Sequence, residues 1–232
     1  MSKLFNYLAL LLIVLPFTSC QEKKAEANVP KWILSMVSDS KNTSAETNFS
    51  NILSDKSVPY IGYIGTDYQK FSIDIQKVQR TDNDQYNVSG ITVVKNNRCD
   101  FRGTIDIVEN REFTHPTYGV DDSMKGQFRR RGCSIAKYNL EEANQTGSGV
   151  FTGYLLFYWY ETNDGKFVYD DIDSHSDSYC NNQYAGTWKS NKTKKSKPCA
   201  WGQYRVPNSG DLDVGAGEFS VNPKYAKNGW GK

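Results

Sequence analysis

Apolar and polar residues alternate along most of the chain from Val58 onward, with the period of two that is typical of β-strands. Clusters of turn-forming residues such as "TDND", "KNN", "ENRE" and "TNDG" separate the alternating segments. The pattern predicts an all-β fold, an antiparallel meander of about eight or more strands. The expected strands lie in "YIGYIGT", "QKFSIDIQKVQ", "YNVSGITVVKN", "CDFRGTIDIVE", "KGQFRRRGCSI", "GVFTGYLLFYWYE", "KFVYDD" and "YAGTWKS".

A loose repeat inside these segments places a glycine two positions after an apolar or aromatic residue. Glycine weakens a strand unless the chain must bend or approach another backbone, which is what the corners of a barrel require. The alternation and glycine spacing resemble those of the meander barrels of the lipocalin and avidin-like families. This resemblance implies a closed barrel, and a β-sandwich is the alternative. The repeat occurs at Val88/Gly90, Phe101/Gly103, Phe151/Gly153 and Tyr184/Gly186.

The segment "VPKWILSMVSD" predicts one short amphipathic helix before the β domain. Trp32, Ile33, Met36 and Val37 recur at helical spacing, and Pro30 suits a first turn. We expect the apolar face to cover the domain, with a lid or a membrane-surface contact as the alternative. The following "SKNTSAETNFSN" reads as a polar linker, and the C-terminal end as an irregular segment.

The first residues have the anatomy of a secretory leader. Lys3 precedes an apolar stretch from Leu8 to Phe17, which is short for a membrane span, and small residues lead to Cys20. The sequence "FTSC" resembles the lipobox of bacterial lipoproteins, although Phe17 departs from the usual aliphatic residue. The resemblance implies cleavage before Cys20 and lipidation of its thiol. An ordinary cleaved signal peptide is the alternative.

These features predict three parts: a lipoprotein signal peptide over 1–19, a lipidated cysteine, tether and short helix over 20–57, and a single β domain with a C-terminal strap over 58–232. Gln21 stands where an aspartate would mark inner-membrane retention in enterobacterial lipoproteins. The resemblance therefore implies a bacterial outer-membrane location, lipid-anchored at the periplasmic face or the cell surface. Several acyl chains make such an anchor effectively permanent.

Four cysteines remain when Cys20 is assigned to the lipid: Cys99, Cys133, Cys180 and Cys199. An even set in an exported chain predicts two disulfides, whose connectivity spacing cannot select. No pair has the close spacing of a structural zinc site.

Charge and aromatic content narrow the class of partner. The formal net charge of +2 is too small for a dedicated nucleic-acid binder. The strand "GVFTGYLLFYWYET" is apolar on both faces, so either both faces are covered by the protein or one is an exposed apolar surface that binds a partner. Tyr158 and Tyr160 share one face with Trp159 opposite, and these three are candidates for an aromatic platform. The alternative is a central strand buried under the N-terminal helix.

Two acidic segments are candidate metal sites, with calcium as the possible ion. The first, "YDDIDSHSDSYC", places Asp171, Asp173, His175 and Asp177 close together after Asp170, and a polar loop is the alternative. The second, "SGDLDVGAGEFS", offers Asp211, Asp213 and Glu218 but lacks the EF-hand register. For that segment we favour a strap that docks on the barrel through Leu212, Val214, Ala216 and Phe219.

The sequence identifies no catalytic residue and no required cofactor. Only two histidines are present, and no G-x-S-x-G elbow occurs. The best hypothesis is an envelope-anchored lipoprotein whose β domain is a non-catalytic binding or inhibitory module for a glycan or for an envelope or secreted protein. The alternative is a secreted metal-dependent hydrolase that uses the acidic cluster around His175.

Overall fold

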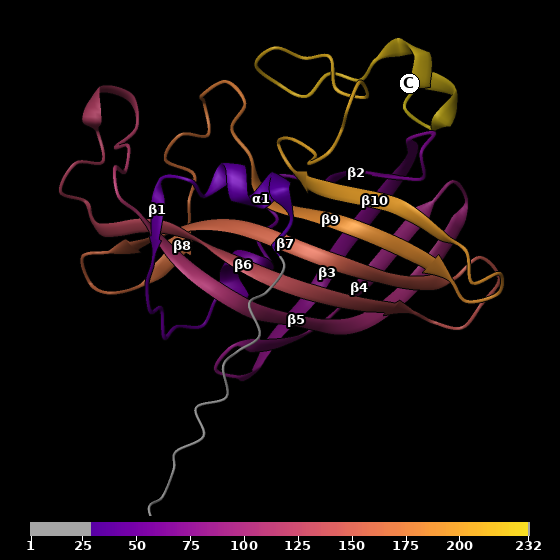
Figure 1. Ribbon diagram of the computed structural model, residues 1–232, viewed down its shortest axis with the longest axis horizontal. Coiled ribbons are helices and arrows are strands. Elements are labelled where there is room, and N and C mark those ends of the chain that lie inside the picture. Colours follow the sequence, from indigo (N-terminus) through magenta and orange to yellow (C-terminus); the bar gives the residue numbers. More distant parts are fainter. Residues whose placement is uncertain (1–28, 232) are drawn as a thin grey trace, which may run out of the picture.

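Eight antiparallel strands close into a ring in the computed structural model, which describes residues 29–231. The ring runs β2-β3-β4-β5-β6-β7-β9-β10 and returns to β2, so nearly every strand pairs with its neighbour in sequence (Figure 1). The predicted all-β meander is confirmed, and its ring of pairings is closed as in a barrel. Two short strands lie off the ring, because β1 pairs with β5 and β8 pairs with the end of β7.

The long strands cross the whole barrel, and β5, β6 and β7 each exceed 13 residues. The ring strands are β2 (Ile61–Ile64), β3 (Gln69–Asp82), β4 (Gln85–Val94), β5 (Asn97–Phe113), β6 (Phe128–Glu142), β7 (Gly149–Thr162), β9 (Asn181–Ser190) and β10 (Ser196–Gln203). The remaining elements are α1 (Lys31–Met36), β1 (Ser40–Asn42), α2 (Ser50–Leu53), η1 (Val120–Asp122), β8 (Phe167–Tyr169) and η2 (Pro223–Asn228).

The repeated glycines sit where the barrel wall is tightly packed. Gly153 and Gly186 are direct partners between β7 and β9, and the hydroxyl of Tyr138 lies over both. A Cβ atom at Gly153 would meet the Ala185 carbonyl oxygen at 2.3 Å and the Tyr138 hydroxyl at 2.6 Å. Only glycine leaves room for the ring of Tyr138, which explains why the repeat interrupts otherwise apolar strands.

Aromatic side chains fill the interior of the barrel. Trp201 stacks on Tyr184 with ring centroids 4.8 Å apart, and it also contacts Phe71, Tyr138 and Phe151. These rings are buried, so each contributes the large burial free energy of an aromatic core residue. The interior therefore acts as a packed core that holds the strands rigid.

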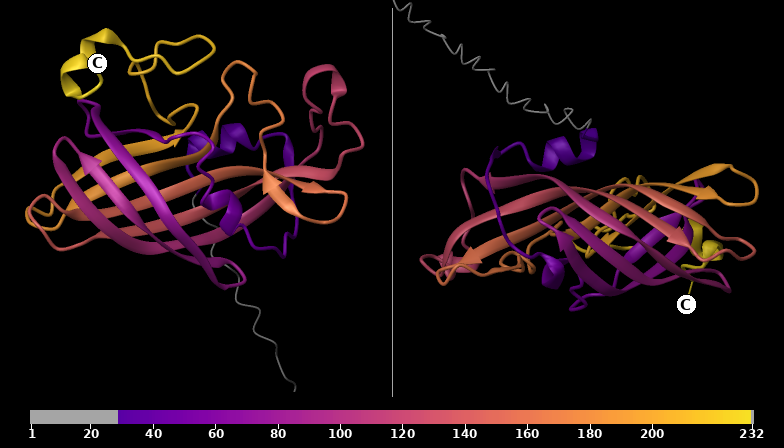
Figure 2. Two further views of the ribbon diagram at one scale, coloured as in Figure 1. Left: turned by 180° about the vertical axis from the view of Figure 1, so that it is seen from behind. Right: turned by 90° about the horizontal axis from the view of Figure 1, so that it is seen from below.

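The N-terminal helix covers the outside of the barrel, as predicted. Ile33 and Val37 of α1 pack against Cys133 and Ile135 of β6 and against Leu156 of β7. Figure 2 shows α1 on the outer side of the strands. The strand "GVFTGYLLFYWYET" is consequently covered on both faces near its middle: alternate side chains reach the interior core, and on the outer face Leu156 is buried while Tyr154 and Tyr158 are half-buried beside α1.

The expectation of a polar linker before residue 58 is wrong. Residues 40–42 form β1 against β5, and α2 inserts Ile52 and Leu53 into the interior core with Phe49 beside them. Phe49 packs edge-on against Phe157 at 5.2 Å and Phe167 at 5.7 Å. Residues of the segment 40–57 therefore belong to the folded unit together with the strands that follow.

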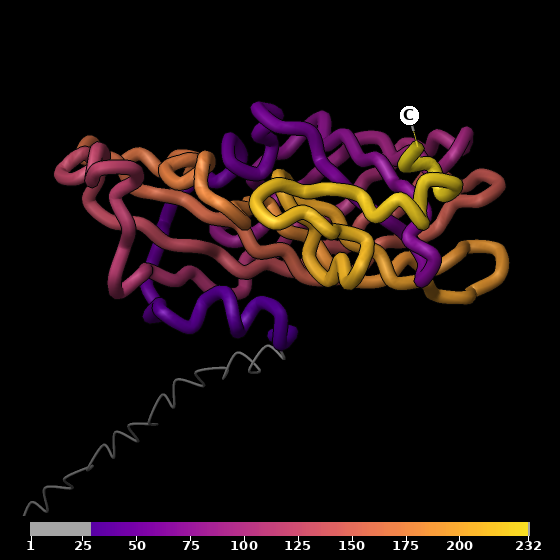
Figure 3. Tube along the Cα trace, turned by 90° about the horizontal axis from the view of Figure 1, so that it is seen from above, coloured from indigo at the N-terminus to yellow at the C-terminus, as the bar shows by residue number. Residues whose placement is uncertain are grey.

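The C-terminal segment docks on the outside of β2 and β10, as the strap interpretation predicts. Leu212 is fully buried there, and Phe219 is half-buried against Trp230. Val214 and Ala216 are exposed, so their assignment to the docking contact is wrong. Arg205 holds the segment by donating to the Asp213 carboxylate and to the carbonyl groups of Gly215, Ala216 and Gly217. Figure 3 shows this segment, in yellow, beside the loop that precedes β9.

The structure contradicts the two predicted disulfides, because all four cysteines of the described chain are free. The reason is their placement on different faces and elements. Cys133 lies under α1, Cys199 faces the interior core, Cys99 lies on β5 and Cys180 directly precedes β9. Among the described residues there is also no helix long and apolar enough to cross a bilayer.

Candidate functional site

A cavity of about 410 Å³ opens on the outer face of β6 and β7, beside α1. We call it the Arg131 pocket. Its volume lies in the range of small-molecule sites, which are mostly apolar clefts with a few convergent polar groups. It is lined by Met36, Phe113, His115, Pro116, Thr117, Arg131, Tyr158, Asp170, Asp173, Ser178, Tyr179 and Cys180.

A buried ion-pair network forms the floor of the pocket. Nε of Arg131 donates to Oδ2 of Asp170 at 2.5 Å, and Nη1 donates to Oδ2 of Asp173 at 2.7 Å and to the Thr117 carbonyl oxygen at 3.1 Å. The side chains of Arg131 and Asp170 are only 8% and 1% exposed. Such a network is costly to bury and needs these hydrogen bonds to be stable, so it fixes the guanidinium firmly.

A β-bulge in β6 aims Arg131 at this network. Strict alternation along "RRR" places Arg129 and Arg131 on one face, with Arg130 opposite. The pairing with β7 shifts register between Phe128 and Arg130, however, and both Arg129 and Arg130 reach Glu161. Arg131 alone therefore turns to the Asp170 side, as bulges commonly do near functional sites.

The loop after β8 supplies the acidic partners, and its backbone is held from two sides. The Asp170 carbonyl oxygen accepts hydrogen bonds from the Tyr179 hydroxyl and from the Asn181 side-chain amide. The Asp170 carboxylate also accepts from the Ile172 backbone N–H at 3.2 Å. Asp170 is therefore positioned before any ligand arrives.

Aromatic and sulfur-containing side chains form the walls. The rings of Phe113 and Tyr158 are tilted by 30° with centroids 6.0 Å apart, and Met36 of α1 also lines the pocket. Two polar atoms beside these walls lack a hydrogen-bond partner among residues 29–231: Nη2 of Arg131 and the hydroxyl of Tyr158. Both are donors, so the pocket offers a ligand two directed hydrogen bonds above an apolar surface.

Burial and hydrogen bonds shift the pKa values of the ionisable side chains that line the pocket. Burial raises the pKa of the Asp170 carboxyl, and the guanidinium of Arg131 acts in the opposite direction. Hydrogen bonds from Thr117 and Arg131 outweigh partial burial and lower the pKa of Asp173. Burial raises the pKa of the Cys180 thiol to about 12, so this thiol is protonated at neutral pH and is not an activated nucleophile.

The predicted aromatic platform is split between two environments. Trp159 is fully buried in the interior core, where its indole N–H donates to the Ser134 hydroxyl at 2.9 Å, so its assignment to a binding surface is wrong. Tyr158 lines the Arg131 pocket, whereas Tyr160 packs near Phe128 outside it. The predicted alternation is confirmed, and one of the three residues belongs to the candidate site.

Neither acidic segment forms a metal site. Within residues 29–231 no group of three His, Cys, Asp or Glu side chains is arranged to hold an ion. The carboxylates bond cations instead: Asp173 bonds Arg131, Asp213 bonds Arg205 and Asp211 bonds Lys224. The structure therefore does not support metal roles for Asp171, Asp173, His175, Asp177, Asp211, Asp213 or Glu218.

The two acidic segments nevertheless meet in space. His175 and Asp177 line a separate hollow of about 470 Å³ together with Glu218 of the C-terminal segment. The backbone N–H of Ser178 donates to the Gly217 carbonyl oxygen at 3.0 Å and joins the two loops. This contact holds the strap against the loop before β9.

Sequence reasoning missed most of the Arg131 pocket. Arg131 was not among the candidate site residues, and Phe113, Met36 and Cys180 carried no signal for a shared site. The available signal was the triple arginine in a β-strand, because an inward-turned arginine requires a carboxylate partner such as Asp170.

Comparison of the chain with protein families, curated proteins and solved structures finds no match.

Proposed function

We propose that the protein is an envelope-anchored bacterial lipoprotein whose β domain is a non-catalytic binding module, with the Arg131 pocket as its ligand site. The observation that supports this most strongly is the combination of a fixed, buried guanidinium with an open apolar cavity above it. Pre-organised sites of this kind favour binding because the protein's own side chains lose little entropy when the ligand binds.

The chemistry of the pocket favours a small ligand, or a terminal group of a larger one, that carries a hydrogen-bond acceptor on a partly apolar body. Nη2 of Arg131 and the Tyr158 hydroxyl would bond the acceptor, while Phe113 and Met36 would pack on the body. A sugar residue of an envelope glycan and a side chain of an envelope or secreted protein both fit this description.

The proposed role is binding because the pocket lacks an activated group. The Cys180 thiol is protonated at neutral pH, and the carboxylates of Asp170 and Asp173 are committed to Arg131. His115 is 84% exposed and faces Asp39 at 3.0 Å, so it stands at the rim. General acid–base catalysis requires a titrating group aimed at the reacting atom.

The anchor proposal depends on Cys20, which lies outside the described residues. Nine chain steps separate Cys20 from Val29, a span of at most about 30 Å when fully extended. Because α1 follows directly and borders the Arg131 pocket, a lipid at Cys20 would keep the pocket close to the membrane surface.

A thermal-shift screen of the mature domain tests the ligand site. The panel would contain monosaccharides, disaccharides, free amino acids and muropeptides, and a ligand of the folded state raises the melting temperature by mass action. Met36→Trp would fill the cavity from its rim and should abolish the shift, whereas Leu34→Trp on the exposed side of α1 should not. A shift that survives Met36→Trp unchanged would place the ligand elsewhere.

A further inference from the structure

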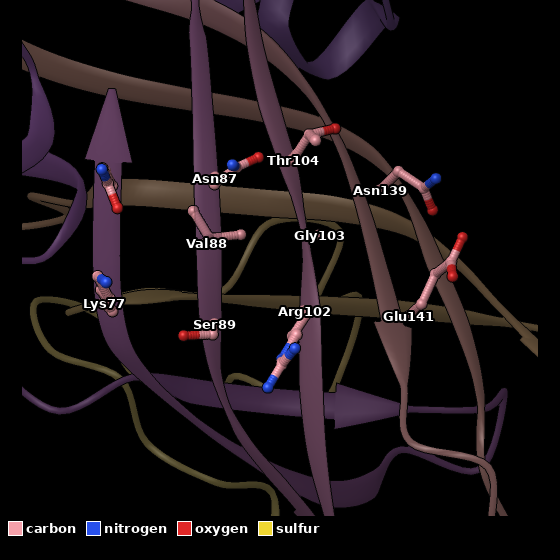
Figure 4. A pocket seen from close by; sticks show the side chains of 10 residues that line it. Lys77, Asn87, Val88, Ser89, Arg102, Gly103, Thr104, Asn139 and Glu141 are labelled. Carbon is pink, nitrogen blue, oxygen red and sulfur yellow. The ribbon is translucent and has the colours of Figure 1, made fainter. Parts of the chain in front are cut away.

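A second hollow, of about 680 Å³, lies on the outer face of β3, β4, β5 and β6, away from the Arg131 pocket. Its surface consists of outward-pointing polar side chains in two rows that cross all four strands, and we call it the polar face (Figure 4). The strand register places Gln79, Asn87, Thr104 and Asn139 in one row. It places Lys77, Ser89, Arg102 and Glu141 in the other.

The hydrogen-bonding groups of the polar face are almost all unused. Of the eight side chains, only Thr104 bonds another described residue, the Asp106 carboxylate at 3.2 Å. Glu141 stands opposite Arg102 in the register, yet among residues 29–231 the two form no ion pair. The face therefore holds amide, hydroxyl and charged groups that only solvent satisfies.

Glu141 is the one carboxylate in the two rows of the polar face, so one of the two cations, Lys77 and Arg102, keeps no counter-charge within the rows. Asp74 is paired with Lys56 at 2.7 Å, and Asp106 accepts from Gln85 and Thr104. Lys77 and Arg102 stand two strands apart in one row, a separation of about 10 Å. With Glu141 included, the eight residues carry a net charge of +1.

The chemistry of the face excludes several classes of partner. Protein interfaces have an apolar, aromatic-rich centre, and the only apolar side chain here is Val88, which is buried at the floor. A nucleic-acid surface needs a dense row of cations, and two cations do not supply it. Amides and hydroxyls can hydrogen-bond with, and isolated cations can pair with, a polymer that carries many hydroxyl groups and occasional carboxylates.

We propose that the polar face binds a linear acidic glycan. Each row repeats every strand at about 4.8 Å, which is close to the length of one sugar ring in an extended chain. Successive rings would then meet successive strands, with sugar hydroxyls on the row of Asn87 and Asn139 and uronate carboxylates on Lys77 and Arg102. Such charge-assisted hydrogen bonds are the stronger ones and weaken with salt.

Binding of polygalacturonate to the mature domain, measured by titration calorimetry at low and high salt, tests this proposal. We expect saturable binding that weakens at least tenfold at high salt, and much weaker binding of neutral dextran. Lys77→Ala/Arg102→Ala should weaken binding at least tenfold, and Asn87→Trp should block the hollow. Lys192→Ala/Lys195→Ala, which removes the same charge from the exposed β9–β10 loop, should leave the affinity within twofold.

The outcomes separate the partners and the two sites. Since the substituted residues of the polar face are exposed, all variants should melt like the parent. Equal binding of poly-glutamate would show a general response to negative charge and overturn the glycan assignment, as would no binding of polygalacturonate. Met36→Trp, which fills the Arg131 pocket, should not affect polygalacturonate binding. The glycan proposal can therefore hold even if the Arg131 pocket proves to bind no ligand.

Discussion

Nε of Arg131 lies 2.5 Å from Oδ2 of Asp170 in a place where neither side chain is more than 8% exposed. Arg131 comes from the middle of the chain and Asp170 from the loop after β8, and the register shift in β6 brings them together. The pair fixes the floor of the Arg131 pocket, so its loss should affect both stability and binding.

Asp170→Asn should lower the free energy of unfolding by about 3 kcal/mol, because it removes the buried partner of the Arg131 guanidinium and leaves only the less buried Asp173 as a counter-charge. Urea denaturation would measure the change. Asp164→Asn is the matched control, since it removes a carboxylate that pairs with Lys166 at the exposed β7–β8 turn. Equal effects of the two substitutions would contradict the buried network.

The free thiols predict a fall in stability at alkaline pH. Burial raises the pKa of Cys133, Cys180 and Cys199 to about 12, from an ordinary value of 9.0. Below pH 9 the thiols are protonated in both states, and their contribution is fully present. Between pH 9 and 12 only the unfolded chain releases these protons, so stability falls by about 1.4 kcal/mol per pH unit for each thiol.

Denaturation in urea at pH 8 and pH 10.5 should show this loss, and Cys133→Ala should reduce it. Thiol titration of the denatured, unreduced mature domain should count four free thiols. A count of zero with an unchanged profile would restore the two disulfides that the even cysteine number predicts.

Leu212→Ala should cost about 2 to 5 kcal/mol, because this fully buried residue anchors the C-terminal segment. Val214→Ala is the control at a 55% exposed position of the same segment and should change little. Calcium and a chelator should give the same melting temperature, since Asp211 and Asp213 pair with Lys224 and Arg205. A rise of several degrees with calcium would support a calcium loop instead.

Cys20→Ala should release the protein from membranes or stall its processing, because it removes the proposed acylation site. Palmitate labelling and fractionation of cells that express the parent and the variant would measure this. Cys99→Ala, which alters a cysteine within the barrel, is the matched control and should remain in the membrane fraction. Equal labelling of both variants would contradict the anchor.

The meander and its covering helix were predictable because both depend on local patterns. Strand alternation and turn clusters identify the elements, whereas the choice between a closed barrel and a sandwich was left open by the sequence. The helix was visible from Trp32, Ile33, Met36 and Val37, whose spacing has one buried face. These patterns are repeated over many residues, so a single residue that breaks the pattern does not change the predicted element.

The insertion of Phe49 and α2 into the barrel and the Arg131 pocket were not predictable, because both depend on contacts between distant segments. Phe49 and Ile52 lie in a stretch of polar composition, yet they fill one part of the barrel interior. The partner of Arg131 depends on a one-residue bulge, and alternation alone gives the wrong neighbours. The disulfide prediction failed for the same reason, since an even count of cysteines contains no information on distance.

Crystallographic fragment screening of the mature domain tests the central claim most directly. If the Arg131 pocket is the ligand site, fragments that carry a hydrogen-bond acceptor on an apolar ring should cluster against Phe113 and Tyr158, with the acceptor on Nη2 of Arg131. Crystals of Met36→Trp should lose that cluster and keep any others. Fragments that leave the pocket empty while they occupy other surfaces would contradict the proposed binding function.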